Sequence, residues 1–554
     1  MSHPTPHSAP PLVLRPVGDR GVLVQLGSLE QVLSLHDWLQ RHPLPGQVDA
    51  VAAAETVLIT ADSAAAARGF AAALRAADLT PVTATDDALV TIDTVYDGED
   101  LDAVARLTGL SRDAVITAHS DQIWTAAFGG FAPGFAYLVG DGRLAVPRRE
   151  TPRPAVPAGS VALADRYSAV YPRVSPGGWQ LIGRTTATLW DLQRAAPALI
   201  RPGNRVQFRA VRELVLAGPG PRPAGQAADP AADPAAEAEA SAFIVRQPGA
   251  QTTVQDLGRP GFADLGVTRS GALDRGALRR ANRLAGNPAT AAVLENALGG
   301  LVLEARYDQV LAVSGAAVPI DVTSGAGTLR TVPVDAPFVV HAGDRVALGT
   351  PSSGMRCYVA VRGGFDVPAV LGSRSTDTLS GLGPAPLSVG TELRVLVAAA
   401  SSVVGDAEPS PAAPPAVTEL RFVPGPRADW IAADSLAEFS RTVYTVSARS
   451  NRIGLRLDGA ALVRSAAATA ASGPAAAELP SEGTVNGAIQ IPASGLPVLF
   501  LADHPVTGGY PVLGVVLHAD LDRAAQLPAG SRLRFVPAAD AANPLTSPPS
   551  TTKG

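Results

Sequence analysis

The chain has 554 residues, of which 46% are hydrophobic and 17% charged, and its formal net charge is −5 at pH 7. This length allows roughly three to five domains, and the weak negative charge argues against a general nucleic-acid binder. No apolar run reaches about 18 residues and the start carries no secretory pattern, so we expect a cytoplasmic protein without membrane attachment. The single cysteine, Cys357, excludes an internal disulfide and a multi-cysteine zinc site.

The first elements belong to an expected small α+β domain at 10–85, which follows a disordered tail at 1–9. The apolar patterns predict strands and helices in alternation, at 21–26, 28–40, 55–61 and 63–77. The 28–40 segment begins after Gly27 and carries apolar residues at helical spacing along one side.

From about residue 88 the spacing of apolar residues changes. Residues 89–96 alternate as in a strand, two short helices are expected near 100–119, and short apolar runs rich in glycine and proline continue to Phe208. This pattern is typical of a compact β-barrel or sandwich with long loops, and it places a β domain at 88–212. The Ala/Pro/Gly-rich stretch 218–241 is expected to be a disordered linker.

Two further β-rich regions complete the chain. The first, 243–400, contains a helix with Leu273, Ala277, Ala281 and Leu284 on one face. The second occupies 418–537, and a disordered tail is expected at 538–554. The expected fold class is therefore mainly β with α+β parts.

Three short motifs occur twice in the same order, which predicts two copies of one β-fold. The pairs are "AGSVAL" (158–163) with "NGAIQI" (486–491), "SPGGWQLIG" (175–183) with "VTGGYPVLG" (506–514), and "RVQF" (205–208) with "RLRF" (532–535). Paired glycines permit positive φ angles and close approach of a ligand or a second backbone. Because duplicated domains often pair about a pseudo-twofold axis, a site in the cleft between the copies is expected.

Lysine is almost absent, since Lys553 is the only one in the chain. A Walker A loop, a Schiff-base enzyme and a biotin carrier all need a lysine side chain, so we expect no biotin attached to this chain. Any recognition of phosphate or carboxylate must rest on arginine, backbone N–H groups or a metal.

Longer motifs resemble a known family. "GGFAPGFAYL" (129–138) and "YPRVSPGGWQLIGRT" (171–185) resemble the signature of the B component of 5-oxoprolinase, whereas 245–288, "LGSRSTD" (371–377) and "DHPVTGGYP" (503–511) resemble the C component of the 5-oxoprolinase/urea amidolyase family. The resemblance implies tandem cyclophilin-like β-barrels and a natural fusion of the B and C components. It also implies ATP with Mg as co-substrate of a complex, a separate partner that resembles the A component of 5-oxoprolinase (a lactam-utilisation protein), and a small-molecule amide substrate. Whether the chain forms a homo-oligomer stays open.

Three functions compete on this resemblance. The first is ATP-dependent opening of the 5-oxoproline lactam to glutamate together with the A component. The second is carboxyl transfer to urea or another amide, for which the biotin carboxylase and carrier would have to be other chains. The third is non-catalytic inhibition of a histidine kinase. The order of the parts, B then C, favours the first function.

The candidate catalytic residues are Arg148, Arg153, Arg374 and His119. The first two arginines lie in the proline-stiffened "PRRETPR" and suit a carboxylate or phosphate clamp. A rigid surface loop with solvated arginines would have the same sequence. His119 follows a predicted helix, and a role in the core competes with a catalytic one.

The candidate substrate- or anion-binding residues lie in glycine-led loops, and no pair of histidines has metal-ligand spacing. They are Gly159, Ser160, Gly177, Gly178, Gln255, Asp256, Arg259, Ser270, Asp274, Ser373, Ser375, Gln490, Thr507, Gly508, Gly509 and Tyr510. Purely structural roles stay open for several of these residues. Asp256 and Arg259 could form a turn-stabilising pair, and Ser270 could be a helix N-cap.

Overall fold

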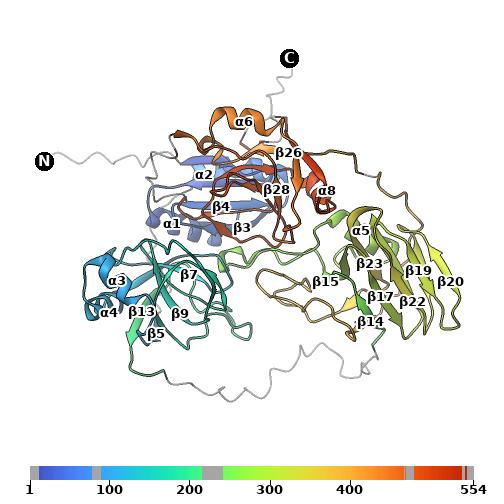
Figure 1. Cartoon of the computed structure of the whole chain (residues 1–554), viewed down its shortest axis with the longest axis horizontal. Helices are drawn as coiled ribbons and strands as arrows, with labels where there is room; N and C mark the ends of the chain where they lie inside the picture. The colour runs from blue at the N-terminus through green and yellow to red at the C-terminus, as the bar shows by residue number, and fades with distance from the viewer. Residues whose placement is uncertain are drawn as a thin grey trace.

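The computed structural model describes residues 12–77, 89–214, 241–412, 414–466, 468, 479–539 and 543–545. Figure 1 shows the N-terminal domain and the C-terminal barrel overlapping at the top, a first barrel at lower left and a β-sandwich at lower right. The expected fold class, mainly β with α+β parts, is confirmed. The expected tail at 1–9 and, except for Ser241, the expected linker at 218–241 lie outside the described residues.

The N-terminal domain is an antiparallel sheet covered by two helices. Its strands, in the order β1-β2-β4-β3, are β1 (Val13–Pro16), β2 (Gly21–Gln25), β4 (Thr56–Ala61) and β3 (Gln47–Ala52), and its helices are α1 (Leu29–Arg41) and α2 (Ala64–Arg75). Both helices begin at a serine, Ser28 or Ser63, whose hydroxyl accepts a hydrogen bond from a first-turn N–H. Such N-caps fix where each helix starts.

Both faces of this sheet are buried. Val22 and Val24 pack with the helices, while Leu23, between them, packs with Leu58 against the C-terminal barrel and contributes to a cluster that includes Val515. Neighbouring strand residues point to opposite faces, so a sheet buried on both sides needs an unbroken apolar strand. This explains why Val22, Leu23 and Val24 are apolar without alternation.

The first barrel is a nearly closed seven-stranded sheet with two helices outside it. Its strands run β12-β9-β10-β7-β6-β13-β5 and are β5 (Leu89–Thr94), β6 (Trp124–Gly129), β7 (Ala136–Val139), β9 (Ser160–Ala164), β10 (Tyr167–Val170), β12 (Gln180–Arg184) and β13 (Arg205–Ala210). The helices are α3 (Leu101–Thr108) and α4 (Arg112–Ser120), and a ribbon joins β8 (Arg153–Val156) to β11 (Ser175–Gly177). An isolated bridge between Val95 and Arg184 brings the barrel edges together.

The second barrel is closed, in the order β26-β33-β30-β31-β28-β27-β34. Its strands are β26 (Thr418–Pro424), β27 (Tyr444–Val446), β28 (Gly454–Asp458), β30 (Ala488–Gln490), β31 (Val498–Phe500), β33 (Val512–Val516) and β34 (Arg532–Pro537). Its short elements are η2 (Ala428–Trp430), α6 (Ala433–Phe439), β29 (Glu482–Gly483), β32 (Thr507–Gly508), η3 (His518–Asp520) and α8 (Leu521–Ala525).

The two barrels have the same topology, as the sequence repeat predicts. In each, the first strand pairs in parallel with the last strand, and the other strands follow in the same order. The repeated glycine-aromatic stretch provides the strand that closes the barrel. A Cβ at Gly98 would lie 2.5 Å from the nitrogen of Gly183, and one at Gly425 would lie 2.9 Å from the nitrogen of Gly514. The same close backbone crossing thus occurs twice.

The part of the chain that lies between the two barrels in the sequence forms a sandwich of a seven-stranded and a five-stranded sheet. The larger sheet contains β14 (Phe243–Pro248), β17 (Leu301–Ala305), β19 (Ile320–Thr323), β20 (Leu329–Val332), β22 (Arg345–Leu348), β24 (Phe365–Asp366) and β25 (Glu392–Val395); the smaller contains β15 (Gln251–Gln255), β16 (Val293–Ala297), β18 (Gln309–Ala317), β21 (Pro337–Val340) and β23 (Ser353–Val361). The helices are η1 (Ala263–Leu265) and α5 (Arg275–Leu284), and the apolar face of α5 packs on the smaller sheet.

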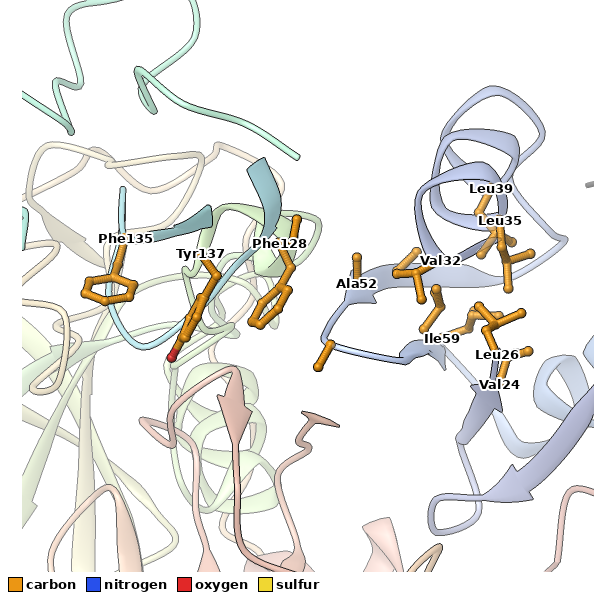
Figure 2. Packing of buried hydrophobic residues seen from close by; sticks show 14 of the residues in the cluster. Val24, Leu26, Val32, Leu35, Leu39, Ala52, Ile59, Phe128, Phe135 and Tyr137 are labelled. Carbon is orange, nitrogen blue, oxygen red and sulfur yellow. The ribbon is translucent and has the colours of Figure 1, made fainter. Parts of the chain in front are cut away.

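One apolar cluster also joins the N-terminal domain to the first barrel. Figure 2 shows Val32 and Ile59 of the N-terminal domain on one side of Ala52, and Phe128 and Tyr137 of the first barrel on the other. Leu545, within the expected C-terminal tail, packs against the same cluster. The N-terminal domain is therefore packed against both barrels.

We predict that cutting the chain within 218–241 leaves the two halves associated, because buried side chains such as Leu58 and Val515 hold them together. The measurement is size-exclusion chromatography of the cleaved protein at micromolar concentration beside the uncut chain. Two separate peaks for the cleaved halves would contradict the prediction.

Candidate functional site

A cavity of about 150 Å³ lies where the N-terminal domain, the 263–275 loop and the second barrel meet. Its walls include Arg20 and Asp49 from the N-terminal domain, Arg269 and Arg275 from the loop, and His518 from the barrel. The cavity therefore needs both halves of the chain. This place differs from the expected cleft between the two barrels, because the N-terminal sheet covers the second barrel.

Positive charge dominates this cavity. Burial, together with the nearby Arg269, Arg279 and Arg20, lowers the pKa of Arg275 to about 9. Burial also lowers the pKa of Arg269, although Asp49 opposes this change. Several guanidinium groups in one small space favour the binding of an anion.

Asp19 and Asp49 are the acidic residues of the cavity wall. Asp49 Oδ1 accepts hydrogen bonds from the backbone nitrogens of Gly261 at 2.9 Å and Ala263 at 3.2 Å. Burial raises the pKa of Asp49 to about 6, and burial with the adjacent Asp49 does the same to the pKa of Asp264. A carboxyl group with such a pKa can exchange a proton near neutral pH.

Two histidines in the wall are uncharged at neutral pH. His504 stacks on Phe500, its Nδ1 lies 2.8 Å from the carbonyl oxygen of Pro505, and burial lowers its pKa to about 4. Burial and the surrounding arginines lower the pKa of His518 to about 3. Neither ring adds to the positive charge.

A buried ionic network lies behind the cavity and joins the sandwich to the second barrel. Arg452 Nε and Nη2 donate to the carboxylate of Asp503 at 2.9 and 3.1 Å, and Nη1 donates to Glu295 of the sandwich. Although burial opposes its charge, Asp503 and Glu295 raise the pKa of Arg452. Each of these three side chains is at most 3% exposed.

The network fixes the loop that lines the cavity. Ser270 Oγ donates to Asp503 at 2.6 Å, and Glu295 accepts from the backbone nitrogen of Leu273 at 3.0 Å. Ser270 has a φ of 53°, a strained conformation for a side-chain-bearing residue. The hydrogen bonds at both ends of 270–273 hold that conformation between Arg269 and Arg275.

Several residues predicted from the sequence belong to this support. The carboxylate of Asp256 accepts from the hydroxyls of Ser373 at 2.7 Å and Ser375 at 2.6 Å, and Gln255 donates to the carbonyl of Thr376 at 2.9 Å. The hydroxyl of Ser270 donates to the same carbonyl at 3.3 Å. The structure thus brings these predicted residues together, but of these only Ser270 lines the cavity.

Two expected alternatives for this region are wrong. The N-cap of α5 is Asp274, whose carboxylate accepts from the nitrogen of Ala277 at 2.8 Å, rather than Ser270. Arg259 does not form the expected turn pair with Asp256, since its guanidinium donates to the carbonyls of Val370 and Ser375.

The predicted arginine clamp lies elsewhere. Arg153 donates to Asp100 at 2.9 and 3.0 Å and to Glu99 at 2.9 Å, in the first barrel. Arg148 is exposed. Arg374 lines a different cavity at the sandwich edge, together with Asp366 and Arg394. These placements do not support one site shared by the three arginines.

The Arg153 pair has a counterpart of opposite polarity in the second barrel. Arg153 lies opposite Gly177 in its ribbon, and Glu482 lies opposite the equivalent Gly508. Glu482 pairs with Arg427, which takes the position that Asp100 has in the first barrel. Because the acid and the base exchange places between the two barrels, we interpret the ion pair as a structural contact that holds the ribbon to the closing strand.

We predict that Arg153→Glu destabilises the protein by about 3 kcal/mol, because it removes one of the two arginines, Arg149 and Arg153, that pair with the buried Asp100 and brings two carboxylates together. Asp100→Arg combined with Arg153→Glu should recover at least about 1 kcal/mol of that loss. Denaturant unfolding of the wild type, both single variants and the double variant gives the coupling energy. A double variant no more stable than the sum of the single effects would contradict the interpretation.

His119 lies in the core of the first barrel. Tyr96 Oη lies 2.7 Å from its Nδ1, Ser168 Oγ lies 2.8 Å from its Nε2, and its ring contacts Trp124 and Phe208. Burial lowers its pKa to about 3. The catalytic assignment of His119 is not supported by this placement.

The predicted glycine-led segments lie in the two ribbons and at the barrel edges. In the first barrel they comprise Gly159, Ser160, Gly177 and Gly178, and a Cβ at Gly177 would lie 2.2 Å from the hydroxyl of Tyr171. In the second barrel they comprise Gln490, Thr507, Gly508, Gly509 and Tyr510. A Cβ at Gly130 of the first barrel would lie 2.1 Å from Thr507 Oγ1, so the two barrels meet at this turn.

The sequence reasoning missed most of the cavity wall. Arg269 and Arg275 flank the predicted Ser270 and Asp274 within the family-like stretch 245–288, so the sequence could have identified both arginines as site candidates. Arg20, Asp49 and His518 come from distant segments without a motif, and only the packing of the N-terminal sheet on the barrel brings them together.

We predict that Asp503→Ala destabilises the protein by about 3–5 kcal/mol, because it leaves Arg452 buried with an incomplete set of partners. Glu419→Ala is the matched control, since Glu419 and Arg534 form an exposed pair worth less than about 1 kcal/mol. Guanidinium unfolding measures both variants. A loss below about 1 kcal/mol for Asp503→Ala would show that the network is not a main support.

The described residues offer neither a metal-binding cluster nor a membrane-spanning helix. Within the described ranges, no group of three or more His, Cys, Asp or Glu side chains is arranged to hold a metal ion. In the same part of the chain, no helix has the length and apolar character needed to span a membrane.

Comparison with known proteins places both halves of the chain in related families. Residues 12–200 match the family "Carboxyltransferase domain, subdomain C and D", and residues 265–537 match "Carboxyltransferase domain, subdomain A and B". The chain is 37% identical to the C component of 5-oxoprolinase from Escherichia coli strain K12 over 52% of this chain and 88% of that protein. It is 43% identical to the B component of 5-oxoprolinase from Bacillus subtilis over 23% of this chain and 54% of that protein.

Other similarities extend these matches. The chain is 32% identical to urea amidolyase of Lachancea kluyveri over 53% of this chain, but it spans only 17% of that protein. The crystal structure of TTHA0988 resembles the whole fold with a TM-score of 0.79 and 32% sequence identity, over 93% of this chain and 99% of that one. Homologues of the B and C components are therefore joined here in one chain.

Proposed function

Because the chain belongs to the carboxyltransferase-domain family that includes the B and C components of 5-oxoprolinase, we propose that it is the fused B and C part of an ATP-dependent 5-oxoprolinase. The complete enzyme would contain a separate protein like the A component and convert 5-oxoproline to glutamate. The observation that carries this proposal is the cavity between the two halves, whose wall combines residues of the B-like half, such as Arg20, with residues of the C-like half, such as Arg269.

The chemistry of the wall suits a lactam with a carboxylate. A lactam carbonyl is a poor electrophile, so ATP would phosphorylate its oxygen and release ADP. Water would then attack the carbonyl carbon, and the C–N bond would break with proton transfer to nitrogen, which leaves an acyl phosphate. A second water would hydrolyse this acyl phosphate and release phosphate and the carboxylate of glutamate. Arginines stabilise the negative charge that develops in such steps. Asp49, with a pKa of about 6, would accept the proton of the attacking water.

ATP would occupy a place other than this cavity. The cavity volume of about 150 Å³ lies below the range of about 300–1,000 Å³ that is common for drug-sized ligands. The nucleotide is therefore assigned to a place outside this cavity, and the proposal puts it on the partner protein or at its interface with this chain. In this arrangement the chain binds the lactam and the partner supplies the activated phosphate.

We predict that Asp49→Asn and Arg269→Ala each lower the rate of glutamate release by about a hundredfold, as expected for loss of a proton acceptor or of a transition-state cation. The assay contains the full chain, the A-like partner protein, ATP and 5-oxoproline. Arg246→Ala is the control, because Arg246 is exposed, pairs with Glu304 and does not line the cavity.

Two outcomes would contradict the proposal. Full activity in both cavity variants would remove the catalytic role of the cavity. A complex that ignores 5-oxoproline but carboxylates urea with an added carboxybiotin carrier would establish the second function, which the similarity to urea amidolyase over 53% of the chain favours. The histidine-kinase inhibitor alternative has no specific structural observation in its favour.

A further inference from the structure

Arg275 is a buried cation without a partner at the edge of the cavity. It is 8% exposed, and its backbone nitrogen donates to Asp522 Oδ1 at 3.0 Å. Across the described ranges, its guanidinium has no hydrogen bond or ion pair with another side chain or carbonyl. An arginine buried in this way costs folding free energy unless a ligand compensates for its lost hydration.

The neighbouring acids make no hydrogen bond with the guanidinium of Arg275. Asp522 directs its carboxylate oxygens to the backbone nitrogens of Arg275 and Gly276, each at 3.0 Å, although its negative charge raises the pKa of Arg275. Asp49 uses Oδ1 for the backbone nitrogens of Gly261 and Ala263. The wall carries Arg20, Arg269 and Arg275 against Asp19 and Asp49, so it keeps an excess of positive charge that an incoming anion would balance.

Two more polar atoms of the wall are buried without a hydrogen-bond partner. They are the side-chain amide oxygen of Asn486 and the Nε of Arg20, which lies 3.9 Å from Asp19 Oδ2 in an ion pair. Buried polar atoms are normally hydrogen-bonded, so the free amide oxygen of Asn486 indicates a polar ligand. An N–H donor fits the free amide oxygen, and an oxyanion fits the two arginines.

We propose that this cavity binds a small molecule that carries one carboxylate or phosphoryl group and an N–H donor, with Arg275 contacting the oxyanion and Asn486 the N–H. The inference rests on the proposed function, since it assigns the recognition of the lactam acid to named residues. The volume of about 150 Å³ favours a small ligand over a nucleotide.

The test measures binding to the intact chain by isothermal titration calorimetry, without the partner protein. The probes are L-5-oxoproline, 2-pyrrolidone, which has the lactam but no carboxylate, and inorganic phosphate. Arg275→Met should weaken 5-oxoproline binding at least about tenfold, whereas Arg275→Lys should retain part of the affinity. Arg246→Met is the matched control at an exposed position.

Thermal unfolding separates a binding role from a structural one. Arg275→Met removes a buried, uncompensated charge, so its melting temperature should equal or exceed that of the wild type. A melting temperature lowered as far as for a core truncation would overturn the proposal, as would equal binding of 5-oxoproline and 2-pyrrolidone or no binding of any probe.

The remaining outcomes distinguish the inference from the proposed function. Binding of phosphate but not 5-oxoproline, lost in Arg275→Met, supports the anion site with phosphoryl as its ligand and contradicts the proposed substrate. Tight binding of 5-oxoproline that is unchanged in Arg275→Met overturns the inference and leaves the proposed function standing.

Discussion

The position of the cavity wall depends on one buried ionic contact, that of Arg452 with Asp503 and Glu295. Two carboxylates from different structural units enclose a single guanidinium that water does not reach. Such an arrangement is stable only when the geometry is good and the remaining polar atoms are satisfied. Ser270 and Leu273 meet part of that demand. The loop between them is consequently fixed, and it carries Arg269 and Arg275 on its flanks.

The N-terminal sheet has an equally important role. Its helices cover one face, and the second barrel covers the other through Leu23 and Leu58. This second contact brings Arg20 and Asp49 to the loop that the ionic network fixes. The B-like half thus completes a site whose largest part belongs to the C-like half, which gives a physical reason for joining both on one chain.

The repeated barrels show which features of a repeat are constrained. The close backbone crossings at Gly98 and Gly425 occur in both copies, because a side chain has no room there. The ion pair beside each crossing keeps its position but reverses its polarity, with Asp100 in one copy and Arg427 in the other. Backbone geometry is therefore the stricter requirement.

The sequence by itself determined local structure and the repeated motifs. Apolar periodicity located the N-terminal helices, and three paired motifs predicted that one strand order would occur twice. The glycine-led motifs also identified residues that meet, including Asp256 with Ser373. These features depend on short-range backbone preferences, which neighbouring residues largely set.

Only the tertiary structure decided which polar residues face a ligand. Arg153 and Arg275 are both arginines near proline or glycine, yet one completes an ion pair and the other lines a cavity. Their difference arises from whether a carboxylate from a distant segment reaches the guanidinium. Long-range packing sets that distance, and the motif around each arginine holds no information about it. For the same reason, Asp49 and His518 could be placed in one cavity only after the N-terminal sheet was seen to pack on the second barrel.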